Sequence, residues 1–172
     1  ESARMRALVE KMLLLARLES AVSVPRVVDV RAVADEAVAT MRARFPDRAI
    51  DVAGEGAATI VDPDDLYAAV HNLVENALNY AASPVRVEAA RDGSAARITV
   101  RDRGPGIAAA DRAKIFERFY RGAVDGVAGS GLGLSIVARV AERWNGTVTL
   151  DSRPGDGAAF TLRFPLAEEV PA

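Results

Sequence analysis

The order of strand-like and helix-like segments is the feature that most restricts how this chain of 172 residues can fold. Apolar residues at spacings of three and four predict helices at residues 1–20, 31–44, 62–80 and 132–145. Short apolar or alternating runs predict strands at residues 27–30, 50–53, 59–61, 85–90, 96–102, 147–150 and 158–164. This order favours an α+β two-layer sandwich, in which three helices cover one face of a mixed or antiparallel sheet and one helix precedes it.

Charge and residue content exclude several classes of protein. The chain has 22 basic and 24 acidic side chains and a formal net charge of −2, so we predict no nucleic-acid partner. It has no cysteine and a single histidine, His71, which excludes disulfide scaffolds and cysteine-based zinc sites. The longest charge-free run, residues 126–138, is too short to span a bilayer, and no signal peptide is visible.

The N-terminal helix has a broad apolar face that requires a partner. Met5, Leu8, Met12 and Leu15 recur at helical spacing, and a Ser-Val-Pro break follows at residues 23–25. One interpretation is that this helix packs on its own domain. The other is that it is half of a helical hairpin whose other half lies outside this chain. We therefore predict a boundary between residues 1–22 and 23–172.

The predicted helix 62–80 carries three asparagines on one stripe. Asn72, Asn76 and Asn79 lie nearly opposite its apolar residues at 100° per residue. Asparagine is a weak helix former, so three of them suggest that their amide oxygens are needed, for example by Mg²⁺ on a phosphate chain. A plain solvated face is the alternative, and a structural role is expected for His71, which lies between the two faces.

Two glycine-rich segments follow in the chain. The first, D-R-G-P-G-I at 102–107, comes directly after a predicted strand, and its glycines permit close approach of the backbone to a ligand. The second, G-S-G-L-G-L at 129–134, opens a helix, whose free N–H groups attract anions. Neither is a P-loop or a Rossmann fingerprint. Between them, I-F-E-R-F-Y-R at 115–121 is followed by a loop with Gly122, Gly126 and Gly129. An aromatic-anchored segment tied to a glycine-hinged loop suits a lid, and a surface loop pinned by Phe116 and Phe119 is a compatible interpretation.

Together, H-N-L-V-E-N-A-L-N-Y at 71–80 and these segments resemble, in order, the N, G1, F and G2 boxes of the ATP-binding domain of bacterial sensor histidine kinases. The hairpin with Gly155, Gly157 and Thr161 is similar to the last hairpin of that family, and residues 1–22 resemble the end of the second helix of its dimerisation hairpin. The resemblance implies the Bergerat ATP-binding fold, with ATP and Mg²⁺ as cofactors.

The resemblance also assigns roles to residues. Asn76 would hold Mg²⁺ through the phosphates with help from Asn72, and Asp102 would bind the exocyclic amine of adenine. Arg118 and Arg121 would act on the γ-phosphate, so the implied catalytic residues are Asn72, Asn76, Arg118 and Arg121. The implied nucleotide-binding residues are Asn76, Tyr80, Asp102, Gly104, Gly106, Ile107, Gly129, Gly131, Leu132, Gly133, Leu134 and Thr161.

The sequence departs from the family pattern at two points. Position 79, usually basic, is Asn79, for which Arg118 or Arg121 would compensate. The phosphoacceptor histidine would precede residue 1, and His71 cannot replace it. The resemblance thus implies a cytoplasmic domain of an inner-membrane sensor, whose partners are a response regulator receiver domain and its own phosphoacceptor helices. It implies a homodimeric full-length protein and allows a monomeric fragment that cannot autophosphorylate alone.

Two other functions remain open at this stage. A hydrolytic ATPase of the same fold would carry a glutamate at the start of the N box, where this chain has Asn72. An anti-sigma-type serine kinase, or a related nucleotide-binding module, would lack the N-terminal helix.

Overall fold

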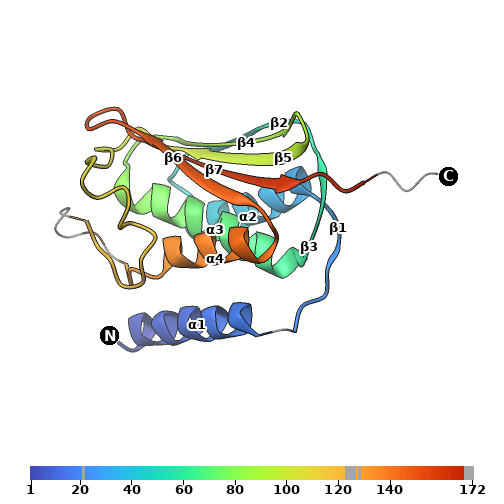
Figure 1. The fold of residues 1–172 in the computed structure, drawn as a ribbon. Coiled ribbons are helices and arrows are strands. Elements are labelled where there is room, and N and C mark those ends of the chain that lie inside the picture. Colours follow the sequence, from blue (N-terminus) through green and yellow to red (C-terminus); the bar gives the residue numbers. More distant parts are fainter. Residues whose placement is uncertain (21, 123–126, 128, 169–172) are drawn as a thin grey trace.

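A computed structural model describes residues 1–20, 22–122, 127, 129–168 of the chain. It has a sheet layer and a helix layer, with a further helix beneath (Figure 1). The helices are α1 (Ser2–Glu19), α2 (Val30–Arg44), α3 (Pro63–Tyr80) and α4 (Gly133–Arg143). The strands are β1 (Arg26–Asp29), β2 (Ile50–Gly54), β3 (Ala58–Val61), β4 (Val85–Asp92), β5 (Ala95–Arg101), β6 (Thr147–Ser152) and β7 (Ala158–Pro165).

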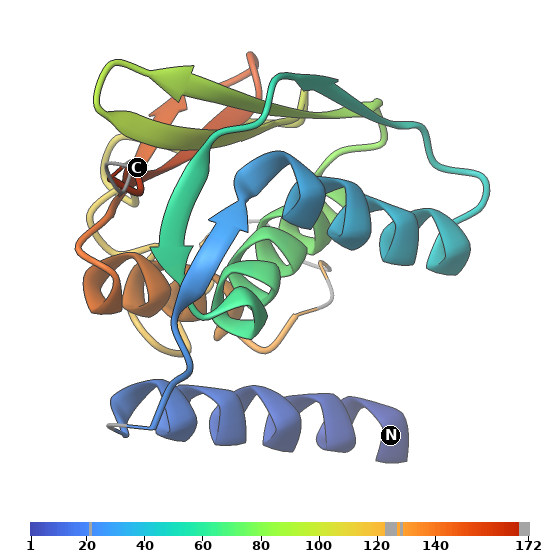
Figure 2. The same ribbon diagram turned by 90° about the vertical axis from the view of Figure 1, so that its right-hand side faces the viewer.

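The main sheet has the strand order β2-β4-β5-β7-β6, with β2 and β4 parallel and the other neighbours antiparallel. Helices α2, α3 and α4 cover one face of it (Figures 1 and 2). On that face, side chains such as Val87 and Ile98 are fully buried against apolar helix residues such as Val70 and Leu73. The predicted α+β sandwich with a mixed sheet is confirmed.

The prediction of a single sheet was incomplete. β1 and β3 form a separate antiparallel pair, in which Val27 lies opposite Ile60. Figure 2 shows this pair running from the main sheet toward α1 along one side of the helix layer. Both strands connect directly to helices, β1 to α2 and β3 to α3, so they are held at the helix layer rather than in the main sheet. A bridge between Thr59 and Leu166 ties β3 to the end of the chain.

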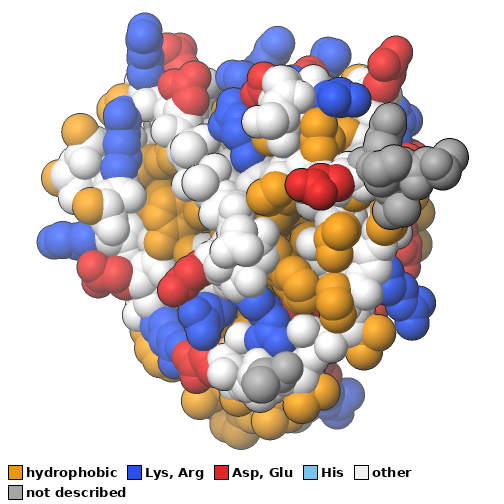
Figure 3. Space-filling view, turned by 45° about the vertical axis from the view of Figure 1, so that its right-hand side comes forward, with side chains coloured by type: hydrophobic (Ala, Val, Ile, Leu, Met, Phe, Trp, Pro, Cys, Tyr) orange, Lys and Arg blue, Asp and Glu red, His pale blue; other side chains and the backbone are white. Residues whose placement is uncertain are grey.

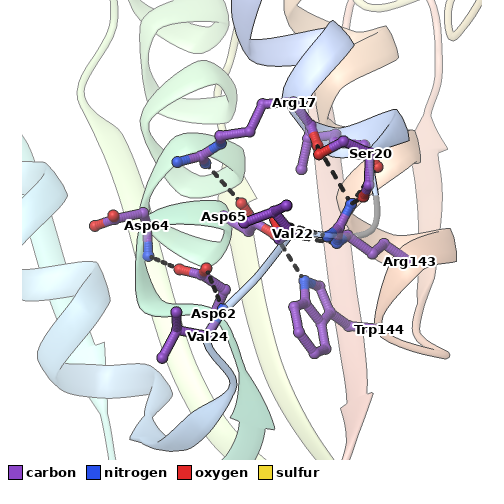
Figure 4. A network of polar contacts seen from close by, with 10 residues as sticks. Arg17, Ser20, Val22, Val24, Asp62, Asp64, Asp65, Arg143 and Trp144 are labelled. Carbon is purple, nitrogen blue, oxygen red and sulfur yellow. Dashed lines mark hydrogen bonds and ion pairs between the residues drawn. The ribbon is translucent and has the colours of Figure 1, made fainter.

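The start of α3 is capped by a side chain. The Asp62 carboxylate accepts the Asp64 N–H at 3.0 Å, and Pro63 occupies the first helical turn, where no N–H partner is lost. The second Asp62 oxygen accepts the Val24 N–H at 3.0 Å (Figure 4), which fixes the segment that leaves α1.

Helix α1 packs against α4 beneath the domain (Figure 1), where Leu15 and Leu18 are buried. The Arg143 guanidinium donates to the Leu18, Ser20 and Val22 carbonyls, and so binds the exposed end of α1 (Figure 4). A guanidinium satisfies several carbonyls at a helix C-terminus well because it has five donors and a positive charge.

One carboxylate joins α1 to two helices of the domain. Asp65 of α3 accepts from the Arg17 guanidinium at 2.7 Å and from the Trp144 indole N–H at 3.0 Å, and Arg143 lies 3.6 Å away (Figure 4). Burial raises the Asp65 pKa above its ordinary value, while the indole and both guanidinium groups act in the opposite direction. This carboxylate and its partners form the polar part of the contact between α1 and the domain.

The outer face of α1 remains apolar and exposed. Met5 and Leu13 are 64% and 65% exposed, and hydrophobic side chains gather at the lower edge of the molecule, where α1 lies (Figure 3). The helix thus packs on its own domain with one side and leaves another side free, so a role in a helical hairpin stays a prediction. Within the described residues, no helix combines the length and the apolar character that crossing a membrane requires.

Candidate nucleotide site

A cavity of about 320 Å³ opens between α3, the loop that follows β5 and the start of α4. Its lining includes one residue from α1 and two from β7 of the sheet. The described residues that line it are Lys11, Asn72, Glu75, Asn76, Asn79, Tyr80, Asp102, Pro105, Gly106, Ile107, Ala108, Asp111, Ile115, Tyr120, Arg121, Gly122, Gly129, Ser130, Gly131, Gly133, Leu134, Pro154, Ala158 and Phe160.

The asparagine stripe of α3 lines this cavity, and exposure rises along it from the buried Asn72 to the exposed Asn79. Asn72 is only 4% exposed, and its amide Nδ2 donates to the Ala68 carbonyl at 2.7 Å. Its Oδ1 is buried without a hydrogen-bond partner among the described residues. Leaving such an oxygen unpaired costs about 1–3 kcal/mol, so this atom is well suited to accept a ligand or an ordered water. Asn76 and Asn79 continue the stripe along the cavity wall.

Asp102 follows directly after β5 and is 6% exposed. Its N–H donates to the Ala158 carbonyl at 2.9 Å, and its Oδ1 accepts the Gly104 N–H at 2.8 Å. Burial raises the Asp102 pKa above its ordinary value, while hydrogen bonding of the carboxylate to the Gly104 and Ala158 backbone acts in the opposite direction. Each carboxylate oxygen can accept more than one hydrogen bond, so the Asp102 carboxylate, which lines the cavity, retains the capacity to accept from a donor on a ligand.

The two glycines after Asp102 are required by the protein's own packing. A Cβ at Gly106, whose φ is 74°, would lie 2.2 Å from the Arg153 carbonyl oxygen. A Cβ at Gly104 would lie 2.9 Å from the Tyr80 carbonyl oxygen. Gly106 lines the cavity whereas Gly104 does not, so Gly104 shapes the site by letting the loop pack on the end of α3.

The start of α4 provides the opposite wall. Gly129, Ser130, Gly131, Gly133 and Leu134 line the cavity there. Leu132 is fully buried in the core and anchors this segment, while Ser130 Oγ accepts the Leu132 N–H at 3.3 Å. The N–H groups at the start of a helix attract anions, so this wall is suited to phosphate.

The segment 115–121 is pinned to the sheet by its aromatic residues. Phe116 packs edge-to-face on Phe160, with ring centroids 6.2 Å apart, and the Tyr120 hydroxyl donates to Asp111. Phe119 is 57% exposed and has a φ of 63°. The predicted lid extends over residues 123–126, which lie outside the described residues, so movement as a lid stays a prediction.

Most of the sequence-predicted site residues come together around the cavity, but four do not line it. Gly104 and Leu132 lie just behind the lining. Thr161 of β7 forms a hydrogen bond with Thr99 inside the sheet, at 3.1 Å. Arg118 forms an ion pair with Glu19 at the end of α1, outside the cavity, whereas Arg121 lines the cavity and donates to the Val127 carbonyl.

Sequence reasoning missed Lys11, Glu75 and Asp111 in the cavity wall. No local pattern links Lys11 to the site, because it lies 61 residues before Asn72 in the sequence. Glu75 could have been found, since it is one turn from Asn72 and from Asn79 on the same helix.

The family of the chain follows from comparison with known proteins. Residues 61–168 match the model of a family described as histidine kinase-, DNA gyrase B-, and HSP90-like ATPase. The chain belongs to this ATPase family. The cavity-forming helix α3, the Asp102 loop and α4 all lie within the matched part of this ATPase domain. The predicted resemblance to the ATP-binding domain of sensor histidine kinases is confirmed.

Named relatives of this ATPase domain are histidine kinases. The chain is 37% identical, over 99% of its length, to the sensor-like histidine kinase SenX3 of Mycobacterium tuberculosis. It is 38% identical, over its whole length, to the signal transduction histidine-protein kinase AfsQ2 of Streptomyces coelicolor. The match spans 44% of SenX3 and 32% of AfsQ2, so the chain covers less than half the length of these relatives.

Solved structures agree with the fold. The mycobacterial sensor histidine kinase MprB matches with a TM-score of 0.71 and 31% identity, covering 84% of this chain and 98% of that one. Full-length ShkA, solved in complex with AMPPNP, matches with a TM-score of 0.80 and 31% identity, covering 96% of this chain and 36% of that one.

Proposed function

We propose that this chain is the catalytic domain of a two-component sensor histidine kinase. In this proposal it binds Mg-ATP in the cavity and transfers the γ-phosphoryl group to a histidine that lies outside residues 1–172. The phosphoryl group then passes to an aspartate of a response regulator receiver domain. The intact protein would be a cytoplasmic-facing kinase of a membrane sensor, homodimeric through helices that include residues 1–22.

The observation that carries this proposal is the arrangement of two polar groups along α3. The orphaned Asn72 oxygen lies beside the start of α4, since a Cβ at Gly133 would be 3.2 Å from it. The buried Asp102 carboxylate lies by the other end of α3, where Tyr80 contacts the Gly104 position. Eight residues of helix separate Asn72 from Tyr80, which is about 12 Å of rise and suits an extended nucleotide.

Each end of the cavity has groups suited to one part of the nucleotide. At the Asp102 end, the carboxylate would accept a hydrogen bond from the adenine amine, with Tyr80 and Ile107 as apolar walls. At the Asn72 end, the N–H groups of Gly131 and Gly133 and the Arg121 guanidinium would bind phosphate oxygens. Phosphoryl transfer depends mainly on such positioning and charge stabilisation.

The donor set also fits Mg²⁺. Asn72 and Asn76 offer neutral amide oxygens on successive turns of α3, and Mg²⁺ binds to proteins through one or two oxygen ligands together with substrate phosphates. When bound, Mg²⁺ would neutralise charge that develops on the phosphates. The chain has Asn72 where a hydrolytic ATPase of this fold would carry a glutamate at the start of the N box, and an amide cannot act as a general base for water. This favours transfer over hydrolysis.

Calorimetry with ADP and with Mg-ATP tests nucleotide binding. We expect Asp102→Asn to abolish measurable ADP binding, because an amide presents donors where the amine needs an acceptor. We expect Asn76→Ala to weaken Mg-ATP binding at least tenfold. His71→Ala, on the same helix but outside the cavity lining, is the matched control. Equal losses in the two alanine variants would contradict the assignment.

Transfer is tested by adding γ-labelled ATP and a separate protein that carries the phosphoacceptor helices. Label on a histidine of those helices is the expected result. Label only on a serine of a partner would favour the serine-kinase alternative, and rapid steady-state ATP hydrolysis by this chain alone would favour a hydrolytic ATPase.

A further inference from the structure

One charged side chain of the cavity wall, that of Lys11, comes from α1 and not from the sheet or from helices α2, α3 and α4. Lys11 lies in the middle of α1, and its ammonium group is 2.7 Å from Glu75 Oε2 of α3. Both side chains are largely buried, at 23% and 16% exposed. Glu75 is one helical turn from Asn72 and from Asn79, so the ammonium group lies beside the asparagine stripe.

Glu75 has a second cationic partner. Its Oε1 accepts from the Arg44 guanidinium of α2 at 3.0 Å, while Lys11 occupies Oε2. Lys11 can therefore leave Glu75 without leaving that carboxylate unpaired. Of the three groups, Lys11 and Glu75 line the cavity, whereas Arg44 lies outside it.

The cavity needs this positive charge if it is to hold several phosphates. Among the described lining residues, the negative side chains are Glu75, Asp102 and Asp111, and the positive ones are Lys11 and Arg121. Helix α3 contributes no lysine or arginine, because its 18 residues contain neither. A triphosphate beside such a wall is attracted by Lys11 more strongly than by any neutral donor.

Helix α1 is held at this position by contacts away from the cavity. Arg17 and Arg143 join it to Asp65 and to α4, one to two turns along α1 from Lys11. Lys11 is 23% exposed and lines the cavity, which fits the usual arrangement of partly buried lysines, in which the apolar stem is covered and the ammonium group reaches a polar site. The position of the ammonium group thus depends on the docking of α1.

We propose that Lys11 binds the terminal phosphates of ATP, exchanging its contact with Glu75 for phosphate oxygens while Arg44 keeps Glu75 neutralised. This inference rests on the proposed function, since it requires ATP in the cavity. It adds a phosphate-binding residue from the N-terminal helix to a site otherwise built by the ATPase domain. ATP affinity then depends on whether α1 is docked.

The test compares ATP, ADP and AMP binding to the complete chain by calorimetry. We expect Lys11→Met to weaken ATP binding roughly tenfold and ADP binding less, because the variant loses a charge-assisted hydrogen bond to the terminal phosphates while the Glu75 contact that Lys11 gives up offsets part of this loss. AMP binding should not change. Methionine keeps the apolar stem, so packing is preserved. Lys114→Met is the matched control, since it removes the other lysine of the chain from an exposed position outside the cavity lining.

A second variant separates charge from structure. Asn79→Lys, added to Lys11→Met, restores a cation one turn from Glu75 and should recover most of the ATP affinity. Hydrogen exchange of the α1 amides in Lys11→Met shows whether the helix stays docked, and we expect it to do so. Equal weakening of AMP, ADP and ATP, no weakening of ATP, or no recovery in the double variant would overturn the role of Lys11. Wild-type protein that binds no adenine nucleotide would instead contradict the proposed function itself.

Discussion

Gly131 holds its backbone at a φ of 73° directly against the backbone of Phe119, at the start of α4. A Cβ there would lie 2.8 Å from both the Cα and the carbonyl carbon of Phe119, and the Gly131 carbonyl accepts the Phe119 N–H at 2.9 Å. Gly131→Ala therefore imposes two penalties, a left-handed backbone for an L-residue and a methyl group pressed on a neighbouring chain segment.

Two other glycines separate these penalties. Gly93→Ala imposes only the backbone penalty, since its φ is 59° and no atom of the described residues lies within 4 Å of the added Cβ. Gly129→Ala imposes neither of them against the part of the chain that the structure describes. We expect Gly93→Ala to lower the free energy of unfolding by about 1 kcal/mol and Gly129→Ala to leave it unchanged or raise it by roughly 0.5 kcal/mol. Gly131→Ala adds about 1–2 kcal/mol of overpacking to the backbone penalty, for a total of about 2–3 kcal/mol.

Urea denaturation followed by circular dichroism measures all three variants under identical conditions. The expected order of stability is Gly129→Ala, then Gly93→Ala, then Gly131→Ala. If Gly131→Ala were as stable as Gly93→Ala, the Phe119 backbone would move away from the added methyl group with no loss in the free energy of unfolding. If it were as stable as Gly129→Ala, the whole account of this segment would be refuted.

Two further predictions concern charged groups. The folded-state pKa of Asp102 lies above its usual value of 3.8, so the ionised carboxylate destabilises the fold at neutral pH; this cost decreases as the pH falls through the folded-state pKa and is gone below 3.8. Asp102→Asn should then be at least as stable as wild type at neutral pH in urea denaturation, with the difference shrinking in acid; a less stable variant would show that the carboxylate has a structural role. Arg121→Met should weaken Mg-ATP binding several-fold, whereas Arg118→Met should change it less than twofold, because Arg118 pairs with Glu19 outside the cavity. Calorimetry measures both variants. A larger loss in Arg118→Met than in Arg121→Met would instead assign Arg118 to the phosphate site.

The elements of the fold were predictable because each has a local signal. The cap at Asp62 and Pro63 and the apolar periodicity of α3 depend only on residues near in sequence. The same applies to the Asp92-Gly93 turn between β4 and β5. The separate β1–β3 pair was not predicted. Which strands pair depends on how the connected helices pack, and the residues near a strand do not indicate its partner.

The candidate site was predictable in part for the same reason. Residues within short motifs, such as Asn72, Asp102 and Gly131, come together around the cavity. The placement of Arg118 was not predictable, because its partner Glu19 is 99 residues earlier in the chain. Lys11 was missed on the same ground, since it reaches the cavity only through the docking of α1.

The contact between α1 and the domain contains the only tryptophan of the chain. The Trp144 indole donates to the Asp65 carboxylate, which Arg17 of α1 shares, and the Arg143 guanidinium lies 5.8 Å from its ring centroid. Release of α1 would take the positively charged Arg17 guanidinium away from the Asp65 carboxylate, and it would expose the surroundings of the indole to water. The fluorescence emission of Trp144 therefore reports whether α1 is docked, without any added label. Because the chain has no cysteine, a single introduced thiol on α1 would supply a quencher or an acceptor at a chosen distance.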